Sequence, residues 1–405
     1  MRMRPISLRR KIISIDNVVI EKKNTVIFNY YFSSNLKTFF RPKNSFSIKY
    51  DFDITKIPAS ILVIPFVTNV LPVAWLLNAT LKIPELDEEF YEHIKDIKNG
   101  YETVYPKLKF AGGIKVQRII NNSYTPTAKV AQSFSGGVDS FSTLINHLAE
   151  QPELVTLIGS DIYFDDKEGI KNITRNTKET AKQFGLKHHI VHSGFHSFLN
   201  EDSLTGLIFP IINDGWWHAI QHGVGLIGHI APIAYIEKIK TFYFPSTLTS
   251  KEFNSKVSCA SYPIIDNGVH VAGMRTIHDG FELMRQQKVK NICDFCDSHK
   301  TSIPLRVCWQ SRGGENCCKC EKCFRTMMAI IAERHDPNEF NFCYDKSLSD
   351  DIKETLRQQV LQISSSILRA IWSPIKQRAV ANKDYIDSNY HELEWFLDTK
   401  IQKIK

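Results

Sequence analysis

The chain lacks any clean apolar stretch of the roughly 20 residues that a membrane-spanning helix needs. Its longest apolar run covers residues 61–83 and is broken by prolines and polar side chains: Pro65, Thr68, Asn69, Pro72, Asn78 and Lys82. A second stretch, residues 12–20, contains Asp16 and Asn17 and makes a poor signal-peptide core. We therefore expect a cytoplasmic protein that has no membrane partner.

Repeats, low-complexity tracts and a strong excess of one charge are also missing from the sequence. Hydrophobic residues make up 43% of the chain and charged residues 23%, which excludes wholesale disorder and a multi-span membrane protein. Lys plus Arg number 51 and Asp plus Glu number 43, so the formal net charge is 51 − 43 = +8. This small excess permits a polyanionic partner without requiring one.

The cysteines are few and unevenly placed, because seven of the nine lie within residues 293–323. An odd number of cysteines crowded at Cys-x-x-Cys spacing predicts a metal site in a reducing compartment rather than a disulfide framework. Four of them are separated by eight, two and two residues: Cys308, Cys317, Cys320 and Cys323. Four thiolates at this spacing suit a structural, tetrahedral Zn²⁺.

Other readings of the cysteine cluster remain open at the level of sequence. An iron–sulfur cluster can use the same four ligands, and buried free thiols need no metal at all. Cys318 adjoins Cys317, and Cys293 and Cys296 form a further Cys-x-x-Cys pair. Any of these three additional thiols could replace one of the predicted ligands.

The hydrophobic pattern predicts an α/β fold with a parallel sheet covered by helices on both faces. A β-rich accessory α+β region is expected at 1–120, where residues 18–20 and 26–32 flank a hairpin turn. The central domain is expected at 127–335 and a helical extension at 336–405. Within the central domain, strands are predicted at 129–134, 154–158, 187–192 and 241–244, and helices at 141–148, 170–184 and within 216–236.

One hexapeptide lies between a predicted strand and a predicted helix: Ser135-Gly136-Gly137-Val138-Asp139-Ser140. Backbone N–H groups at a helix start lack intrahelical partners and favour an anion, and glycine allows a phosphate to approach closely. Ser135 and Ser140 add hydroxyl donors, and Asp139 is placed to ligate Mg²⁺. The motif therefore predicts a nucleotide phosphate site, although a capped strand-to-helix turn would use similar residues. The Walker and Rossmann glycine motifs are absent.

The hexapeptide resembles the signature of the PP-loop ATP pyrophosphatases, which belong to the adenine nucleotide alpha hydrolase-like (HUP) superfamily. The resemblance implies that ATP is cleaved between its α and β phosphates while AMP is transferred to an oxygen of the acceptor. A nitrogen or sulfur nucleophile then displaces AMP. By position, the catalytic residues implied are Ser135, Asp139 and Ser140, and the whole loop 135–140 binds the nucleotide.

The loop and the cysteine cluster together resemble the 7-cyano-7-deazaguanine synthase (QueC-like) family of queuosine biosynthesis, over residues 127–335. That resemblance implies a C–N ligase that uses ATP, Mg²⁺ and Zn²⁺ to activate a carboxylate for attack by ammonia or another amine. The zinc ligands that it implies are Cys308, Cys317, Cys320 and Cys323. Longer relatives occur in antiphage defence, so the acceptor is expected to be a small-molecule carboxylate or a partner protein.

Further residues could contact the nucleotide. Asp161 closes the second predicted strand, where it could reach the substrate or ribose, or simply cap a turn. Arg285 and Lys288 are three residues apart on one helix face and could neutralise ATP phosphates, or form a solvated basic face. Residues 312–314, Arg-Gly-Gly, lie between predicted zinc ligands and could form a substrate loop or a plain turn.

Two other functions fit parts of the pattern. A PP-loop tRNA-modifying enzyme of the thiolation type would adenylate a base for sulfur attack, and the net charge of +8 would favour RNA. The thiolation reading requires redox-active thiols, whereas four closed zinc ligands leave few of them. The other alternative is a nucleotide-binding component of a defence or polysaccharide cassette that no longer turns over.

Overall fold

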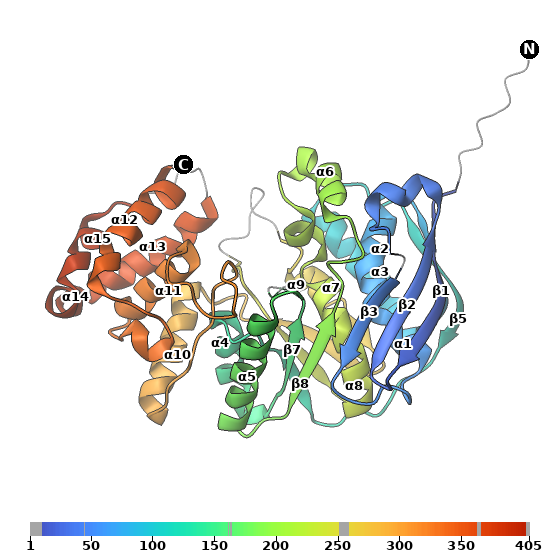
Figure 1. The fold of residues 1–405 in the computed structure, drawn as a ribbon, viewed down its shortest axis with the longest axis horizontal. Helices are drawn as coiled ribbons and strands as arrows, with labels where there is room; N and C mark the ends of the chain where they lie inside the picture. Colours follow the sequence, from blue (N-terminus) through green and yellow to red (C-terminus); the bar gives the residue numbers. More distant parts are fainter. Residues whose placement is uncertain are drawn as a thin grey trace, which may run out of the picture. The chain divides into compact units, whose positions relative to one another are not determined.

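A computed structural model describes residues 10–43, 45–160, 162, 164–250, 259–362 and 366–401. It shows an α/β fold with a large, mostly parallel sheet flanked by helices (Figure 1). The order of the strands in the sheet is β10-β11-β9-β6-β7-β8-β3-β2-β1-β4-β5. The strands are β1 (Ile12–Glu21), β2 (Thr25–Phe32), β3 (Ser45–Tyr50), β4 (Thr80–Asp87), β5 (Gly113–Ile120), β6 (Val130–Ser133), β7 (Glu153–Ile158), β8 (His188–Ser193), β9 (Thr241–Pro245), β10 (His270–Val271) and β11 (Met274–Asp279).

The chain folds as two compact units that interleave along the sequence. Unit 1 comprises residues 1–131, 189–244 and 258–278, and unit 2 comprises residues 132–188, 245–257 and 279–405. The predicted division into 1–120, 127–335 and 336–405 follows the chain linearly, whereas each unit gathers segments that are far apart in sequence.

The first hairpin confirms a local prediction in unit 1. Strands β1 and β2 pair antiparallel, with Glu21 opposite Thr25. The turn between them places Lys22 and Lys23 at positive φ, 50° and 62°. Two residues at positive φ match the right-handed twist of the flanking strands, which explains the tight reversal.

The strands of the N-terminal region belong to the large sheet. Strand β3 pairs antiparallel with β8, with Ile48 opposite Ser193 and Tyr50 opposite Val191. Strand β1 pairs with β4, and β4 with β5, in parallel. The predicted accessory region thus extends a sheet rather than forming a separate one.

The long apolar run of residues 61–83 forms buried helices and a strand. It includes α2 (Ile64–Leu76). Pro72 lies inside this helix and has no backbone N–H, so it cannot donate to the carbonyl four residues before it. Asn69 is buried and donates its amide to the carbonyls of Pro65 and Gly225, at 2.9 and 3.0 Å. Among the described residues, no helix has the length and apolar character required to cross a membrane.

The remaining helices of unit 1 cover the sheet and frame its loops. They are η1 (Ser34–Phe39), α1 (Ala59–Leu62), α3 (Glu88–Val104), α6 (Glu201–Ile212), η3 (Trp217–Gln221), α7 (Val224–Ile227), η4 (Gly228–Ile230), α8 (Ala231–Glu237) and α9 (Pro263–Asp266). The predicted buried helices within 216–236 are therefore confirmed, although they are short and separated by turns.

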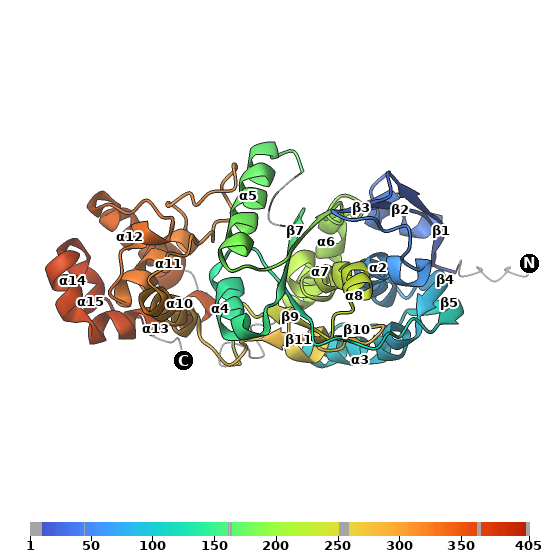
Figure 2. The ribbon, with the colours of Figure 1, turned by 90° about the horizontal axis from the view of Figure 1, so that it is seen from below.

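Unit 2 packs helices around a core that includes Phe141, Leu144, Met327 and Trp372. Figures 1 and 2 both show α10, α11 and α13 side by side. The helices are α4 (Val138–His147), η2 (Leu148–Glu150), α5 (Lys167–Gln183), α10 (Arg285–His299), α11 (Glu321–Ala332), η5 (Pro337–Phe340), η6 (Lys346–Leu348), α12 (Ser349–Thr355), η7 (Leu356–Gln362), α13 (Ser366–Ala381), α14 (Lys383–Asn389), η8 (His391–Leu393) and α15 (Glu394–Asp398). The prediction that the chain after residue 335 is helical is confirmed.

Candidate functional site

The glycine loop of unit 2 connects the end of β6 to the start of α4, as the sequence predicts. Gly136 adopts a φ of +76°, a left-handed conformation that glycine reaches without strain. A Cβ built on Gly136 would meet no atom within 4 Å, so the loop faces open space. Gly137 is the N-cap of α4, and no side chain caps this helix start. The free N–H groups and the open space together suit an anion.

The two serines of the loop play different structural parts. The hydroxyl of Ser140 is buried and donates to the carbonyl of Gly137 at 3.0 Å, so it braces the loop from within. Ser135 is exposed. Of the two predicted hydroxyl donors, Ser135 is the one placed to reach a ligand in this structure.

An irregular segment around Arg306 contacts the loop through its backbone. The backbone N–H of Arg306 donates to the carbonyl of Gly136 at 2.8 Å. The carbonyl of Arg306 would lie 3.4 Å from a Cβ at Gly137. Sequence reasoning missed this support, because residues around Arg306 carry no helical or alternating pattern.

Asp139 forms a buried ion cluster with two cations from α10. The Arg285 guanidinium lies 3.1 Å from one carboxylate oxygen of Asp139, and the Lys288 ammonium lies 3.3 Å from the other. Only 5% of the Arg285 side chain and 2% of the Lys288 side chain are exposed. Lys288 also donates to the carbonyl of Ser246.

These ion pairs decide the charge state at the loop. Burial by itself would raise the pKa of Asp139, but Arg285 and Lys288 outweigh burial and hold the pKa of this carboxyl below its usual value. The alternative of a solvated basic face is wrong, since both cations are buried. The Nε of Arg285 is a buried donor that has no hydrogen-bond partner within the described part of the chain. The role of Asp139 as a Mg²⁺ ligand stays a prediction, because in this structure its oxygens face the two cations.

A polar network that the sequence did not reveal joins α4 to the end of β11. Asp279 accepts a hydrogen bond from the Thr143 hydroxyl at 2.7 Å and contacts His147 Nε2 at 2.9 Å. Burial would raise the pKa of Asp279, but His147 and Thr143 outweigh it and lower the pKa. The network ties α4 to Asp279 within unit 2. Asp161, the other predicted contact, lies outside the described residues.

The four predicted zinc ligands converge. The sulfurs of Cys308, Cys317, Cys320 and Cys323 all lie within 4.8 Å of one another. The Sγ atoms of Cys308 and Cys320 are 3.8 Å apart, and those of Cys317 and Cys323 are 3.9 Å apart. In a tetrahedral site with Zn–S bonds of 2.3 Å, neighbouring sulfurs are separated by about 3.8 Å. The geometry of the four thiols therefore fits Zn²⁺.

The other nearby cysteines do not join this group. Cys293 and Cys296 are buried on α10, in the hydrophobic core of unit 2. Burial raises the pKa of Cys296 to about 11, as expected for an inert core thiol. Cys318, at a φ of +54°, points its sulfur at the carbonyl of Asn316 at 3.7 Å.

The segment 312–314 is held by the start of α5. Arg312 forms an ion pair with Asp165 at 2.5 Å, and the N–H of Gly313 donates to Asp166 at 2.9 Å. Asn172 donates its amide to the Gly313 carbonyl, also at 2.9 Å. These contacts anchor the turn that precedes Cys317.

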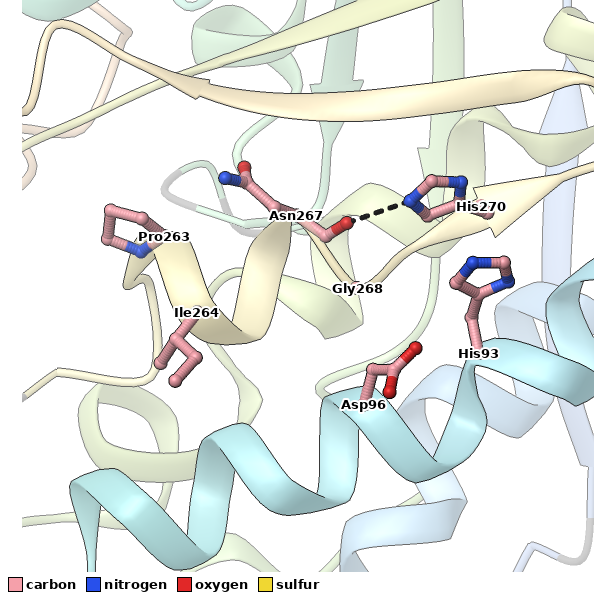
Figure 3. Close-up of a pocket in the computed structure, with 7 residues that line it drawn as sticks. All are labelled: His93, Asp96, Pro263, Ile264, Asn267, Gly268 and His270. Carbon is pink, nitrogen blue, oxygen red and sulfur yellow. Dashed lines mark hydrogen bonds between the residues drawn. The ribbon is translucent and has the colours of Figure 1, made fainter.

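Unit 1 has a shallow pocket of about 560 Å³ that contains none of the predicted site residues (Figure 3). His93 and Asp96 from α3 line one side, and Asn267 and His270 line the other. The imidazole rings of His93 and His270 stack, with centroids 4.0 Å apart.

Known proteins offer no further guide to the site. Comparisons of the chain with protein-family models, with curated proteins and with solved structures give no match.

Proposed function

We propose that unit 2 is an adenylating centre that cleaves ATP to AMP and pyrophosphate, with the phosphates bound at residues 135–140. The observation that carries the proposal is the uncapped, glycine-lined start of α4 beside two buried cations. Arg285 and Lys288 bring two positive charges and Asp139 one negative charge, so the cluster keeps a net positive charge. A buried positive charge next to helix N–H groups favours the charge that develops on departing pyrophosphate.

The reaction assigns defined parts to residues of this chain. An acceptor oxygen attacks the α-phosphorus of ATP, and the bond from that phosphorus to the α–β bridging oxygen breaks. The N–H groups of the loop and the Ser135 hydroxyl hold the β and γ phosphates, while Arg285 and Lys288 stabilise the leaving pyrophosphate. Mg²⁺, when bound, would neutralise phosphate charge, and Asp139 is the carboxylate of the loop that could help to hold it.

For the acceptor we propose a carboxylate of the 7-carboxy-7-deazaguanine type, or a carboxyl group on a partner protein, with ammonia or an amine as nitrogen donor. This part of the proposal is supported by the resemblance of the loop and cysteine spacing to 7-cyano-7-deazaguanine synthases. The four thiols leave no open ligand position, so Zn²⁺ would act structurally, by joining the segment after Cys308 to the start of α11.

We expect Ser135→Ala to reduce pyrophosphate release by at least tenfold without changing the melting temperature, because Ser135 is an exposed residue at the start of the glycine loop. The measurement is pyrophosphate release from ATP, Mg²⁺ and 7-carboxy-7-deazaguanine, with and without ammonium, together with mass spectrometry of the products. Ser142→Ala is the matched control. Its hydroxyl is buried on α4 and lacks a partner among the described residues, so we expect near-normal turnover.

The outcomes separate the competing functions. Wild-type turnover by Ser135→Ala would show that the loop does not bind the phosphates. Release that depends on tRNA and a sulfur donor would favour the thiolation reading. Nucleotide binding without release, with every carboxylate tested, would favour a component that does not turn over.

A further inference from the structure

Unit 1 contains a cluster of titratable side chains around Cys259 that the proposed ATP chemistry does not use. Cys259 is 3% exposed, and its sulfur lies 3.7 Å from Nδ1 of His222. His218 also interacts with the sulfur, and its Nδ1 contacts Asp214 at 2.6 Å. The His218 side chain is 45% exposed, so the cluster extends from a buried thiol to the surface.

An irregular backbone brings these groups together. The N–H of His222 bonds to the carbonyl of Trp217 at 2.8 Å, five residues back, which makes η3 a π-type turn. Such turns are rare and occur frequently at functional sites. The carbonyl of His218 accepts the N–H of Ala260 at 3.0 Å, which fixes the residue that follows Cys259.

Gly223 explains why His222 can approach so closely. Its φ is +88°, and a Cβ there would lie 2.4 Å from Oδ1 of Asp266 and 3.1 Å from the carbonyl of Ala260. A side chain at this position would push the segment carrying His222 away from the segment carrying Cys259.

The charges favour a thiolate. Burial would raise the pKa of Cys259, but hydrogen bonds from His218 and His222 outweigh burial and lower it to about 6. Burial would lower the pKa of His218, but Asp214 and Cys259 outweigh burial and raise it to about 10. Burial would lower the pKa of His222, but the hydrogen bond and negative charge of Cys259 outweigh burial and raise it.

A buried carboxyl group, that of Asp266, lies next to the cluster around Cys259. Asp266 is fully buried, accepts from the Ser261 hydroxyl at 2.9 Å and contacts His278 at 2.8 Å. Its Oδ1 has no hydrogen-bond partner within the described ranges and lies beside Gly223. Tyr101 of α3 donates its hydroxyl to the carbonyl of Ile220 at 2.6 Å, and the ring of His222 contacts that of Trp217. A buried carboxyl oxygen that accepts no hydrogen bond, and that lies beside a cysteine–histidine pair, can accept one from an imidazole or from a ligand N–H.

A metal centre does not account for this arrangement. Among the described residues, the groups whose ligand atoms are mutually close enough to hold one ion do not include Cys259. A cysteine paired with histidine, where a carboxylate orients a second histidine, instead matches the requirements of nucleophilic catalysis.

We propose that Cys259 is a nucleophile that accepts an acyl group from an activated carboxyl compound and forms a thioester. The thiolate sulfur attacks the carbonyl carbon, a C–S bond forms, and the bond from that carbon to the leaving group breaks. The protonated His222 gives its proton to the leaving group, and a later nucleophile releases the acyl group and regenerates the thiolate. Asp214 holds His218 in place, so His218 is a positioning residue. This inference concerns unit 1 alone and does not depend on the ATP site.

The experiment that tests the acyl step uses p-nitrophenyl acetate as the activated acyl donor and the full chain. We expect a burst of p-nitrophenol, and peptide mass spectrometry should find one acetyl group on Cys259 that hydroxylamine removes. Cys259→Ser should lose the adduct and the burst. Cys343→Ser removes an exposed cysteine elsewhere in the chain and should retain both. Acetylation confined to other residues, in protein with a normal circular dichroism spectrum, would overturn the proposal.

A second measurement tests the thiolate without relying on turnover. The rate of Cys259 alkylation by iodoacetamide should reach half its maximum near pH 6. The double variant His218→Gln, His222→Gln leaves burial unopposed and should shift this midpoint to about 8.5 or higher, which lowers the rate at pH 7 at least about 30-fold. A wild-type midpoint above pH 8, or an unchanged midpoint in the folded double variant, contradicts an activated thiolate.

Discussion

Replacing Cys320 by serine is expected to remove zinc from the protein and to lower its melting temperature sharply. Three of the four thiols, those of Cys308, Cys320 and Cys323, belong to the hydrophobic core of unit 2, so loss of the ion would leave that core without its crosslink. Structural zinc contributes on the order of 10 kcal/mol of binding free energy in zinc-finger peptides, and this binding energy is also folding energy. Zinc content by mass spectrometry of metals and thermal unfolding with and without a chelator measure the effect.

The neighbouring cysteines provide the control for this experiment. Cys317→Ser should lose zinc in the same way, whereas Cys318→Ser, one residue along, should retain one zinc per chain. The sulfur of Cys317 faces Cys323 at 3.9 Å, but that of Cys318 faces the carbonyl of Asn316. Equal zinc content in Cys317→Ser and the wild type would remove Cys317 from the ligand set. If the purified protein contains iron and acid-labile sulfide, the four cysteines hold an iron–sulfur cluster and not zinc.

Asp139→Asn is expected to abolish pyrophosphate release and to lower the free energy of unfolding by about 3–5 kcal/mol. The amide removes the charge that balances Arg285 and Lys288, whose side chains are 5% and 2% exposed. Arg285 and Lys288 would then be two buried cations without the carboxylate that balances them, and the contact of Lys288 with the carbonyl of Ser246 brings no opposite charge. Urea unfolding followed by circular dichroism measures the loss.

A matched control lies on α10, the helix that carries Arg285 and Lys288. Asp294 pairs with Lys290 at 2.5 Å, but 58% of the Asp294 side chain is exposed, so Asp294→Asn should change stability by at most about 1 kcal/mol. Pyrophosphate should also raise the melting temperature of Asp139→Asn more than that of Asp294→Asn, because the anion takes the place of the lost carboxylate. If Asp139→Asn proves as stable as Asp294→Asn, the ion cluster is not formed in solution.

The loss of stability and the loss of activity in Asp139→Asn have to be distinguished. Assays below the unfolding transition, with the folded fraction measured in the same buffer, separate the two. Ser135→Ala supplies the complementary case, since its exposed hydroxyl is not part of the buried cluster.

Local patterns in the sequence were sufficient for the elements of the fold. The hairpin of β1 and β2, the strands β6 to β9 and the helix α5 lie close to their predicted positions, because periodicity and turn residues act over a few neighbours. The convergence of Cys308, Cys317, Cys320 and Cys323 could also be predicted, since all four lie within one short stretch. The glycine loop was found for the same reason.

Only the tertiary structure decided which distant side chains meet. Asp139 and Arg285 are 146 residues apart, and no local pattern indicates that α10 buries its two cations against the loop. In the sequence, Cys259 lies far from the cysteines of residues 293–323, and His218 and His222 lie within the apolar stretch 216–236. Their meeting depends on a π-type turn and on a glycine at positive φ, which are properties of the folded backbone. Sequence alone therefore determined the elements and the local motifs, and packing determined the charge of both candidate centres.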